Sequence, residues 1–214
     1  MCGLPSDTKT LIAQELSHTM HVPNVLRTDD IEEILRLHPS VCMDTHRSIL
    51  DMSLDGASSM IEEYKKECQI IHKAMQHDVL KAFKDGKSII IEGFHLDPEY
   101  IVQQYVVDDT STKHSALVIP ILIHMDQDQY SVDAQSWIET STGSTVDSQC
   151  LLVERVHSTI GEYLQNACRS HAIPAIKVDM VDWNKALEDI HEYILQGIEM
   201  MMTDREINKI NTSM

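Results

Sequence analysis

Two short apolar runs constrain the fold of this chain more than any other feature of its sequence. "SIIIEG" (88–93) and "ALVIPILIHM" (116–125) are apolar at consecutive positions, without the alternation expected when one face of a strand meets solvent. Strands of this kind are buried on both faces, which is typical of parallel sheets covered by helices. The sequence therefore predicts a parallel sheet inside an α/β domain.

Predicted strands and helices alternate along the rest of the chain. Two further strand signals lie at "VPNVLRT" (22–28) and "IPAIKVD" (173–179), and apolar residues recur at helical spacing in the segments between strands. This order predicts a doubly wound parallel sheet in one domain over 1–202, followed by a polar tail over 203–214. Helices are expected at 8–20, 28–38, 53–84, 98–107, 147–171 and 182–201, and loops at 108–115 and 126–146.

The stretch "GLPSDTKT" (3–10) is similar to a phosphate-binding P-loop, whose pattern is G-x-x-x-x-G-K-[ST]. Gly3, Lys9 and Thr10 match the pattern, whereas Thr8 replaces its second glycine. In such a loop Lys9 would neutralise charge between the β- and γ-phosphates, and Thr10 would bind Mg²⁺. A β-branched Thr8 is unfavourable where the backbone must approach phosphate. The pattern alone favours a chance loop before a helix, and the residues after the loop favour a nucleotide site.

The strand that normally precedes a P-loop is missing from this sequence. Only Met1 and Cys2 stand before Gly3, and a strand needs about 5 residues. Without it, two strand edges inside the sheet would lack backbone partners. Two explanations remain open: a truncated or alternatively started chain, or a sheet that closes imperfectly and is only marginally stable.

Candidate site residues also follow two of the predicted strands. Asp29 comes after "VLRT", and Glu92 and His95 come after "III". The carboxyl ends of parallel strands face the ligand crevice, where Asp29 could orient an acceptor hydroxyl or take its proton. Glu92 could bind Mg²⁺ through water. Thr28 and Asp29 could instead only cap a helix, and Glu92 could only have a backbone partner.

The composition disfavours several classes of partner. The chain has 34 acidic and 17 basic residues and a formal net charge of −17, so neither nucleic acid nor anionic lipid is expected to bind. Five scattered cysteines predict a reduced intracellular protein, cytoplasmic or nuclear. No apolar run approaches the ~20 residues of a membrane span, and no signal peptide is visible. The charged cluster at 62–68 is expected on a solvated helix face.

Five segments, taken in order, carry a family resemblance: "GLPSDTKT", "VPNVLRTDDIEEILR", "KSIIIEGFHLDPEYI", "ALVIPILIHMD" and "YLQNACRSHAIPAIKVDMVDW". The chain resembles the P-loop kinase family of archaeal 2-phosphoglycerate kinase, including the plant low-phytic-acid P-loop proteins. The strongest matches are the Thr28–Asp29 pair and the run Glu92–Leu96. The resemblance implies transfer of a phosphoryl group from ATP, with Mg²⁺, to a small phosphorylated acid or polyol. It places Lys9 and Thr10 at the phosphates and Asp29 near the acceptor.

The same resemblance implies a weakened activity. In these kinases a segment after the fourth strand supplies arginines to the transferred phosphate, but "DQDQYSVDAQSWIE" (126–139) contains no Arg or Lys. A basic position of the family early in the second helix is Glu32 here, although Arg36 remains. The sequence therefore predicts a nucleotide-binding protein with weakened or lost kinase activity. The alternative is a catalytically inactive relative that acts as a binding or regulatory module, with an unknown protein partner.

Overall fold

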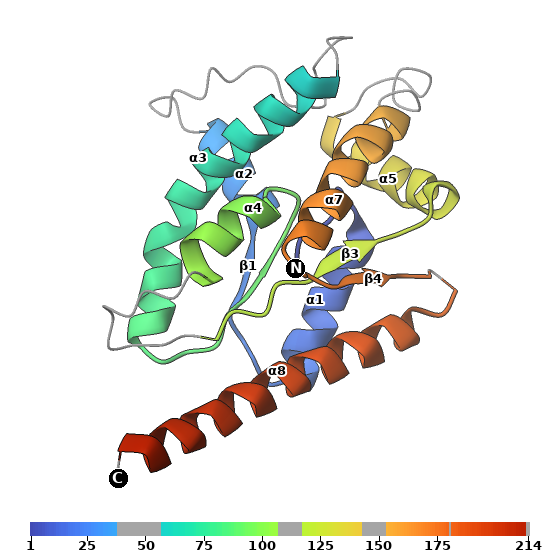
Figure 1. The fold of residues 1–214 in the computed structure, drawn as a ribbon. Helices are drawn as coiled ribbons and strands as arrows, with labels where there is room; N and C mark the ends of the chain where they lie inside the picture. Colours follow the sequence, from blue (N-terminus) through green and yellow to red (C-terminus); the bar gives the residue numbers. More distant parts are fainter. Residues whose placement is uncertain (38–56, 107–116, 143–152, 180, 213–214) are drawn as a thin grey trace.

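The computed structural model describes residues 1–37, 57–106, 117–142, 153–179 and 181–212 (Figure 1). These ranges combine short strands with long helices, which confirms the predicted α/β class. Within them, no helix is both long enough and apolar enough to cross a membrane.

All four predicted strands are present, each shorter than expected. β1 (Val25–Arg27) pairs in parallel with β2 (Ile90–Glu92), and β3 (Leu122–His124) pairs in parallel with β4 (Ala175–Lys177). The parallel pairing agrees with the unbroken apolar runs of the sequence. The described strands form two two-stranded sheets, so one continuous doubly wound sheet of the P-loop type stays a prediction.

Cys2 lies between these two sheets. It forms isolated parallel bridges to Gly93, just after β2, and to Leu122 of β3. The Cys2 N–H donates to the Ile121 carbonyl at 2.9 Å, and the Ile123 N–H donates to the Cys2 carbonyl at 2.8 Å. The order across the molecule is therefore β1, β2, Cys2, β3, β4. The sequence predicts that the strand before the P-loop-like stretch is absent. At the place of that strand, the structure has the two bridges of Cys2 to Gly93 and Leu122.

Local sequence signals explain where several helices begin. The Ser6 hydroxyl accepts a hydrogen bond from the Lys9 amide and caps the first helix, and Asp97 caps a later one through the Glu99 amide. The helices are α1 (Asp7–Thr19), α2 (Thr28–Leu37), α3 (Ala57–Lys84), α4 (Pro98–Ile101), α5 (Gln127–Thr142), α7 (Glu162–Ser170) and α8 (Trp183–Thr212). Two π-helical turns, Val102–Val106 and His157–Gly161, extend α4 and precede α7.

Two predictions about helices are wrong. Residues 127–142, expected in a loop, form α5, because Tyr130 and Ala134 are one helical turn apart and both are buried. This burial outweighs the polar composition that suggested a loop. The closing helix, expected to end at residue 201, continues through 203–212. The loop expected at 108–115 lies outside the described residues, as do 53–56 and 147–152 of the expected helices.

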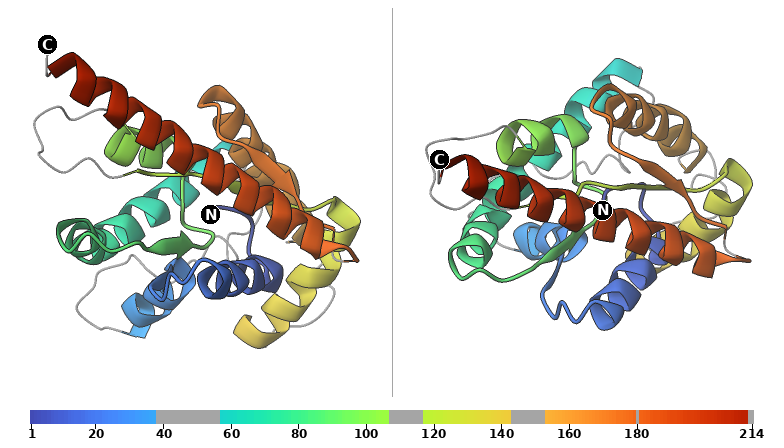
Figure 2. Two further views of the ribbon diagram at one scale, coloured as in Figure 1. Left: turned by 90° about the horizontal axis from the view of Figure 1, so that it is seen from below. Right: turned by 60° about the horizontal axis from the view of Figure 1, so that its bottom comes forward.

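Helices cover both faces of the strands. Leu122 belongs to an apolar cluster with residues of α3 and α7, whereas its neighbours Ile121 and Ile123 belong to a second cluster with residues of α1, α5 and α8. Successive strand side chains point to opposite faces, so these two clusters lie on opposite sides of the strands. Both views of Figure 2 show α8 spanning the width of the molecule.

Candidate functional site

The P-loop-like stretch leads directly into α1, as the sequence predicts. Gly3 approaches the backbone closely, since an added Cβ would lie 2.6 Å from the Ile123 carbonyl oxygen. α1 begins at Asp7, so Lys9 and Thr10 fall in its first turn. Lys9 is fully buried, which is rare for a lysine unless its ammonium has a partner. The start of α1 thus carries a buried positive charge.

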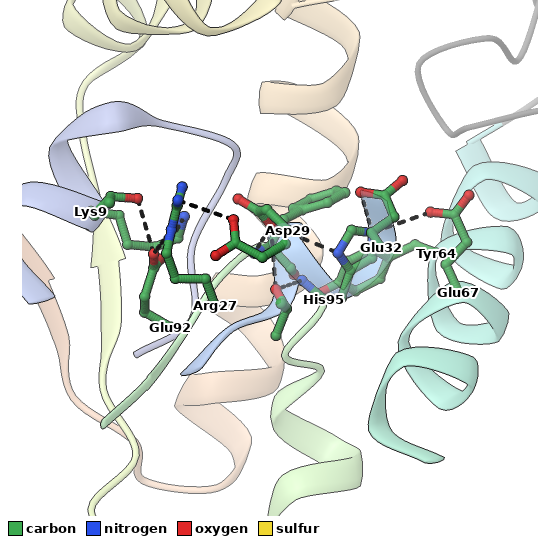
Figure 3. Close-up of polar contacts among 12 residues, drawn as sticks. Lys9, Arg27, Asp29, Glu32, Tyr64, Glu67, Glu92 and His95 are labelled. Carbon is green, nitrogen blue, oxygen red and sulfur yellow. Dashed lines mark hydrogen bonds and ion pairs between the residues drawn. The ribbon is translucent and has the colours of Figure 1, made fainter. Parts of the chain in front are cut away.

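Glu92, at the end of β2, holds three side chains around one buried carboxylate (Figure 3). Its Oε2 lies 3.4 Å from the Lys9 Nζ. Its Oε1 accepts hydrogen bonds from the Thr10 hydroxyl at 2.9 Å and from the Arg27 Nε at 3.1 Å. These side-chain partners decide against the interpretation of Glu92 as a residue bonded only to backbone. Lys9, Thr10 and Glu92 form one connected group.

The Lys9 ammonium retains unused hydrogen-bonding capacity. Among the described residues, neither Lys9 Nζ nor Glu92 Oε2 has a hydrogen-bond partner, although the two atoms form an ion pair. Buried polar atoms without partners are costly and are uncommon in native proteins. An ammonium of this kind fits a phosphate oxygen, and a carboxylate with a hydroxyl beside it fits Mg²⁺ or its bound water. The residues present therefore suit the expected ligands chemically.

Asp29 lies beside this group and ties α2 to the segment after β2. Its Oδ1 accepts from the Phe94 amide at 3.4 Å, and the Thr28 hydroxyl oxygen accepts from the His95 amide at 3.3 Å. Burial alone would raise the pKa of Asp29, but the positive charges of Lys9 and His95, with the Phe94 hydrogen bond, lower it overall. Asp29 is therefore an ionised carboxylate near Lys9.

Gly93 allows this close approach between the two segments. Its φ is +148°, a value that side chains rarely permit, and an added Cβ would lie 1.7 Å from the Thr28 Oγ1. Any larger residue would push Thr28 away from β2. Glycine at this position therefore permits the close contact between the end of β2 and the start of α2, which carries Asp29.

His95 is buried among three carboxylates, two from α2 and one from α3. Its Nδ1 lies 3.8 Å from Asp29, and its Nε2 lies 3.7 Å from Glu32 and 3.5 Å from Glu67. Burial lowers the pKa of His95, but the hydrogen bond to Glu67 and the charges of Glu32 and Asp29 raise it overall. This cluster favours the imidazolium form.

The sequence did not predict that Glu67 contacts His95. Glu67 belongs to the charged cluster at 62–68, which is expected on a solvated helix face, but it is buried. Glu67 is buried on the apolar side of α3, near Tyr64 and Cys68. A charged residue between apolar residues at helical spacing is the signal that could have identified it. Tyr64, on the same face, donates from its hydroxyl to the Phe94 carbonyl at 2.9 Å. α3 thus supports the segment that carries His95.

A second carboxylate missed by the sequence stands at the start of α1. Asp133 of α5 is buried, and its Oδ1 accepts from the Thr8 hydroxyl at 3.2 Å. Burial raises the pKa of Asp133, hydrogen bonds from Ser6 and Thr8 lower it, and the net shift is upward. Helix starts attract anions through their free amides. Asp133 therefore lies where a phosphate would be expected.

The space beside the loop is small in this structure. A cavity lined in part by Ser6, Lys9, His124 and Tyr130 has a volume of about 20 Å³. That is room for about one water molecule. The cavity as it stands is therefore too small for a phosphate group.

Arg36, which remains near the position of the basic family residue, is engaged elsewhere. Its guanidinium forms an ion pair with Glu32, one turn earlier on α2. Arg27 pairs with Asp30 at 3.0 Å as well as with Glu92. Both arginines therefore have acidic partners. Of the predicted site residues, the structure brings together Lys9, Thr10, Asp29 and Glu92, and Gly3 adjoins Lys9.

Comparisons with known proteins point to kinases at low identity. No family model matches the chain. It is 23% identical over 180 residues to 2-phosphoglycerate kinase of Methanothermobacter thermautotrophicus, covering 79% of this chain and 57% of that protein. It is 19% identical over 172 residues to 2-phosphoglycerate kinase of Methanocaldococcus jannaschii, covering 78% and 53%. A third match, 2-phosphoglycerate kinase of Pyrococcus furiosus, is 29% identical over 104 residues, covering 45% and 34%. The chain spans just over half the length of the first two relatives.

Proposed function

We propose that this chain is a nucleotide-binding protein of the 2-phosphoglycerate kinase type whose phosphoryl transfer is weakened or lost. The observation that carries the proposal is the buried Lys9 ammonium at the start of a helix, with hydrogen-bonding capacity unused. A buried cation costs free energy unless its partners compensate it, and an anionic ligand would complete that compensation. The low-identity similarity to kinases supports the same conclusion.

Each residue of the group has a role in this proposal. Lys9 binds the ATP phosphates, and Asp29, as an ionised carboxylate, orients the acceptor hydroxyl or accepts its proton. Thr10 and Glu92 hold Mg²⁺, which neutralises phosphate charge when bound. The acceptor is a small phosphorylated acid or polyol, as the family resemblance implies.

Three features oppose efficient transfer. Thr8 stands where glycine would let the backbone contact phosphate, and Asp133 places a carboxyl group at the same point. The segment 126–139 supplies no cation to the transferred phosphate. An arginine acting on the transferring phosphate is worth roughly 10³–10⁵ in rate. Binding with little turnover is therefore expected.

Thermal unfolding with and without Mg-ATP tests the binding site. A ligand that binds only the native state raises the melting temperature, so the parent chain should show a shift. Lys9→Met should abolish this shift, whereas the control Lys87→Met should retain it, because Lys87 is exposed and pairs with Asp85 rather than with a residue of the group. A parent chain with no shift at saturating Mg-ATP would contradict nucleotide binding.

The second candidate function is a catalytically inactive binding or regulatory module. Asp133 favours it, because this carboxyl group fills the phosphate position with part of the chain itself. A product assay with Mg-ATP and 2-phosphoglycerate separates the two functions. Complete absence of product at high protein concentration supports the inactive module, whereas slow phosphorylation that disappears in Asp29→Asn supports the weakened kinase.

A further inference from the structure

Two buried cysteines from distant parts of the sequence face each other with their thiols. Cys2 is 4% exposed and Cys168 is 0% exposed, and both belong to the apolar cluster that includes residues of α3 and α7. The Cys168 thiol donates a hydrogen bond to the Cys2 sulfur. The Cys2 thiol in turn donates to the Ile121 carbonyl at 3.4 Å. Figure 1 shows the amino terminus beside the end of α7, the helix that carries Cys168.

Backbone contacts hold both cysteines against β3. Cys2 forms a parallel bridge to Leu122 of that strand. The Leu122 amide donates to the Pro174 carbonyl at 2.9 Å, and the neighbouring Ile173 amide donates to the Cys168 carbonyl at 2.9 Å. A disulfide forms only between cysteines that already approach closely, because its geometry is narrow. This framework supplies that approach.

The surroundings make the two thiols chemically unequal. The hydrogen bond from Cys168 lowers the pKa of Cys2 overall, although burial opposes this shift. The same hydrogen bond, together with burial, raises the pKa of Cys168. The thiolate is the nucleophilic form of cysteine, so Cys2 is the thiol that reacts first. Cys68, in the same apolar cluster, has a pKa that burial raises well above its ordinary value, so it is the unreactive cysteine of the group.

A cavity gives a small oxidant access to Cys2. Cys2 lines an apolar cavity of about 500 Å³, which also borders the exposed residues Gly86 and Lys87. Hydrogen peroxide is small and uncharged, so it enters an apolar space at low cost. A charged disulfide such as oxidised glutathione would have to leave its hydration behind.

We propose that Cys2 and Cys168 are a redox site at which a peroxide produces an intramolecular disulfide. The Cys2 thiolate attacks one oxygen of hydrogen peroxide, the O–O bond breaks, and Cys2 becomes a sulfenic acid. The departing hydroxide takes up the proton that Cys2 released and becomes water. The Cys168 sulfur then attacks the Cys2 sulfur, the S–O bond breaks, and the hydroxyl group leaves as water with the Cys168 proton. Two thiols thus lose two electrons, and one peroxide is reduced to two water molecules.

The disulfide ties the P-loop-like stretch to α7. Cys2 directly precedes Gly3, where that stretch begins, and Cys168 lies in the last turns of α7. The crosslink closes a loop of about 166 residues and stabilises the protein mainly by restricting the unfolded chain. Oxidation should therefore raise the melting temperature, by about 5–10 °C for a chain of this size.

Peptide mapping of the full chain after treatment with stoichiometric hydrogen peroxide tests the site. Cys42 and Cys150, which lie outside the described residues, are replaced by serine so that they form no competing crosslinks. The treated protein is alkylated in denaturant, digested without reduction and analysed by mass spectrometry. The peptides that contain Cys2 and Cys168 should be recovered as one linked species, lighter than their sum by the two hydrogens lost, and should separate after reduction.

Two variants and the melting temperature complete the test. Cys168→Ala should lose both the linked peptide and the rise in melting temperature, whereas Cys68→Ala, at a buried cysteine of the same cluster, should keep both. Dithiothreitol should reverse the rise, which distinguishes a disulfide from methionine oxidation. Recovery of Cys2 and Cys168 as separate peptides after peroxide, or of Cys2 linked to Cys68, would overturn the proposal. A rise that persists in Cys168→Ala would overturn it as well.

Discussion

Asp133 controls the charge at the start of α1. Its carboxyl group accepts a hydrogen bond from the Thr8 hydroxyl and lies beside Ser6, the capping residue of the helix. Lys9, the cation of the same region, is partly compensated by its ion pair with Glu92 at 3.4 Å. The local field for an incoming anion is therefore weaker than a buried lysine at a helix start would provide alone.

Replacing this carboxyl group should strengthen nucleotide binding. Asp133→Asn keeps an oxygen that accepts from Thr8 but removes a negative charge near the phosphates, which is worth about 1 kcal/mol, or about fivefold in affinity. Calorimetric titration with Mg-ATP measures the change. The matched control is Asp128→Asn on the exposed side of the same helix, which should have little effect. Equal affinities of the two variants would show that Asp133 does not oppose the nucleotide.

Lys9 and Glu92 should behave as a coupled pair. Glu92→Leu leaves the Lys9 ammonium buried without its counter-charge and should cost about 3–5 kcal/mol of unfolding free energy. The double variant Lys9→Met/Glu92→Leu removes both charges and should recover much of that loss. Urea unfolding of the two single variants and the double variant gives the coupling free energy. Strictly additive losses would mean that the pair contributes no interaction of its own.

At the scale of elements, the junction between β2 and α2 positions the candidate site. Gly93 follows β2 and lies against Thr28, the first residue of α2. Across this junction the Asp29 carboxylate accepts from the Phe94 amide, and the Thr28 hydroxyl accepts from the His95 amide. α3 supports the same junction through Tyr64. These contacts join three elements around two short segments, so a change at the junction should disturb the whole site.

Two glycine variants test how tight this junction is. Gly93→Ala forces a Cβ to within 1.7 Å of Thr28 Oγ1 and should destabilise strongly or prevent folding. Gly86→Ala also imposes a side chain at positive φ, +64°, but meets nothing within 4 Å, so it should cost only about 1 kcal/mol. Urea unfolding compares them. Similar losses would mean that backbone conformation, not the contact with Thr28, decides the cost at Gly93.

At the scale of the whole molecule, buried histidines couple folding to pH in opposite directions. His95 has a raised pKa, so its contribution to stability is present below its ordinary value and is lost as pH rises through the folded pKa. His72 is buried on α3 with neither ring nitrogen hydrogen-bonded among the described residues, and burial lowers its pKa from 6.5 to about 4. His72 therefore favours the folded state above pH 6.5 and loses that contribution on acidification.

Removing His72 should reduce the acid sensitivity of the fold. Between pH 6.5 and about 4 the unfolded chain binds a proton at His72 that the native protein does not bind. At pH 5 this difference costs about 2 kcal/mol, which His72→Phe should restore relative to pH 8. Urea unfolding at both pH values measures it, with the exposed His77→Phe as control. An equal pH dependence of His72→Phe and the parent chain would refute the assignment.

The sequence by itself determined the elements that depend on local pattern. Unbroken apolar runs were sufficient to predict parallel strands at 88–93 and 116–125, because burial on both faces leaves no polar alternation. The P-loop-like stretch, together with the polar residues that follow the strands at 22–28 and 88–91, also singled out Lys9, Asp29 and Glu92 as neighbours. Local composition failed for α5, because the burial of Tyr130 and Ala134 depends on what that segment packs against.

Only the tertiary structure decided the partners of these residues. Thr10 reaches Glu92 across 82 positions of the chain, and Thr8 reaches Asp133 across 125. The carboxylates around His95 come from α2 and α3, and no spacing in the sequence relates them. Hydrogen bonds and charges act over a few ångströms, whereas sequence patterns describe one element at a time. The packing of the helices on the strands therefore set the electrostatics of the site.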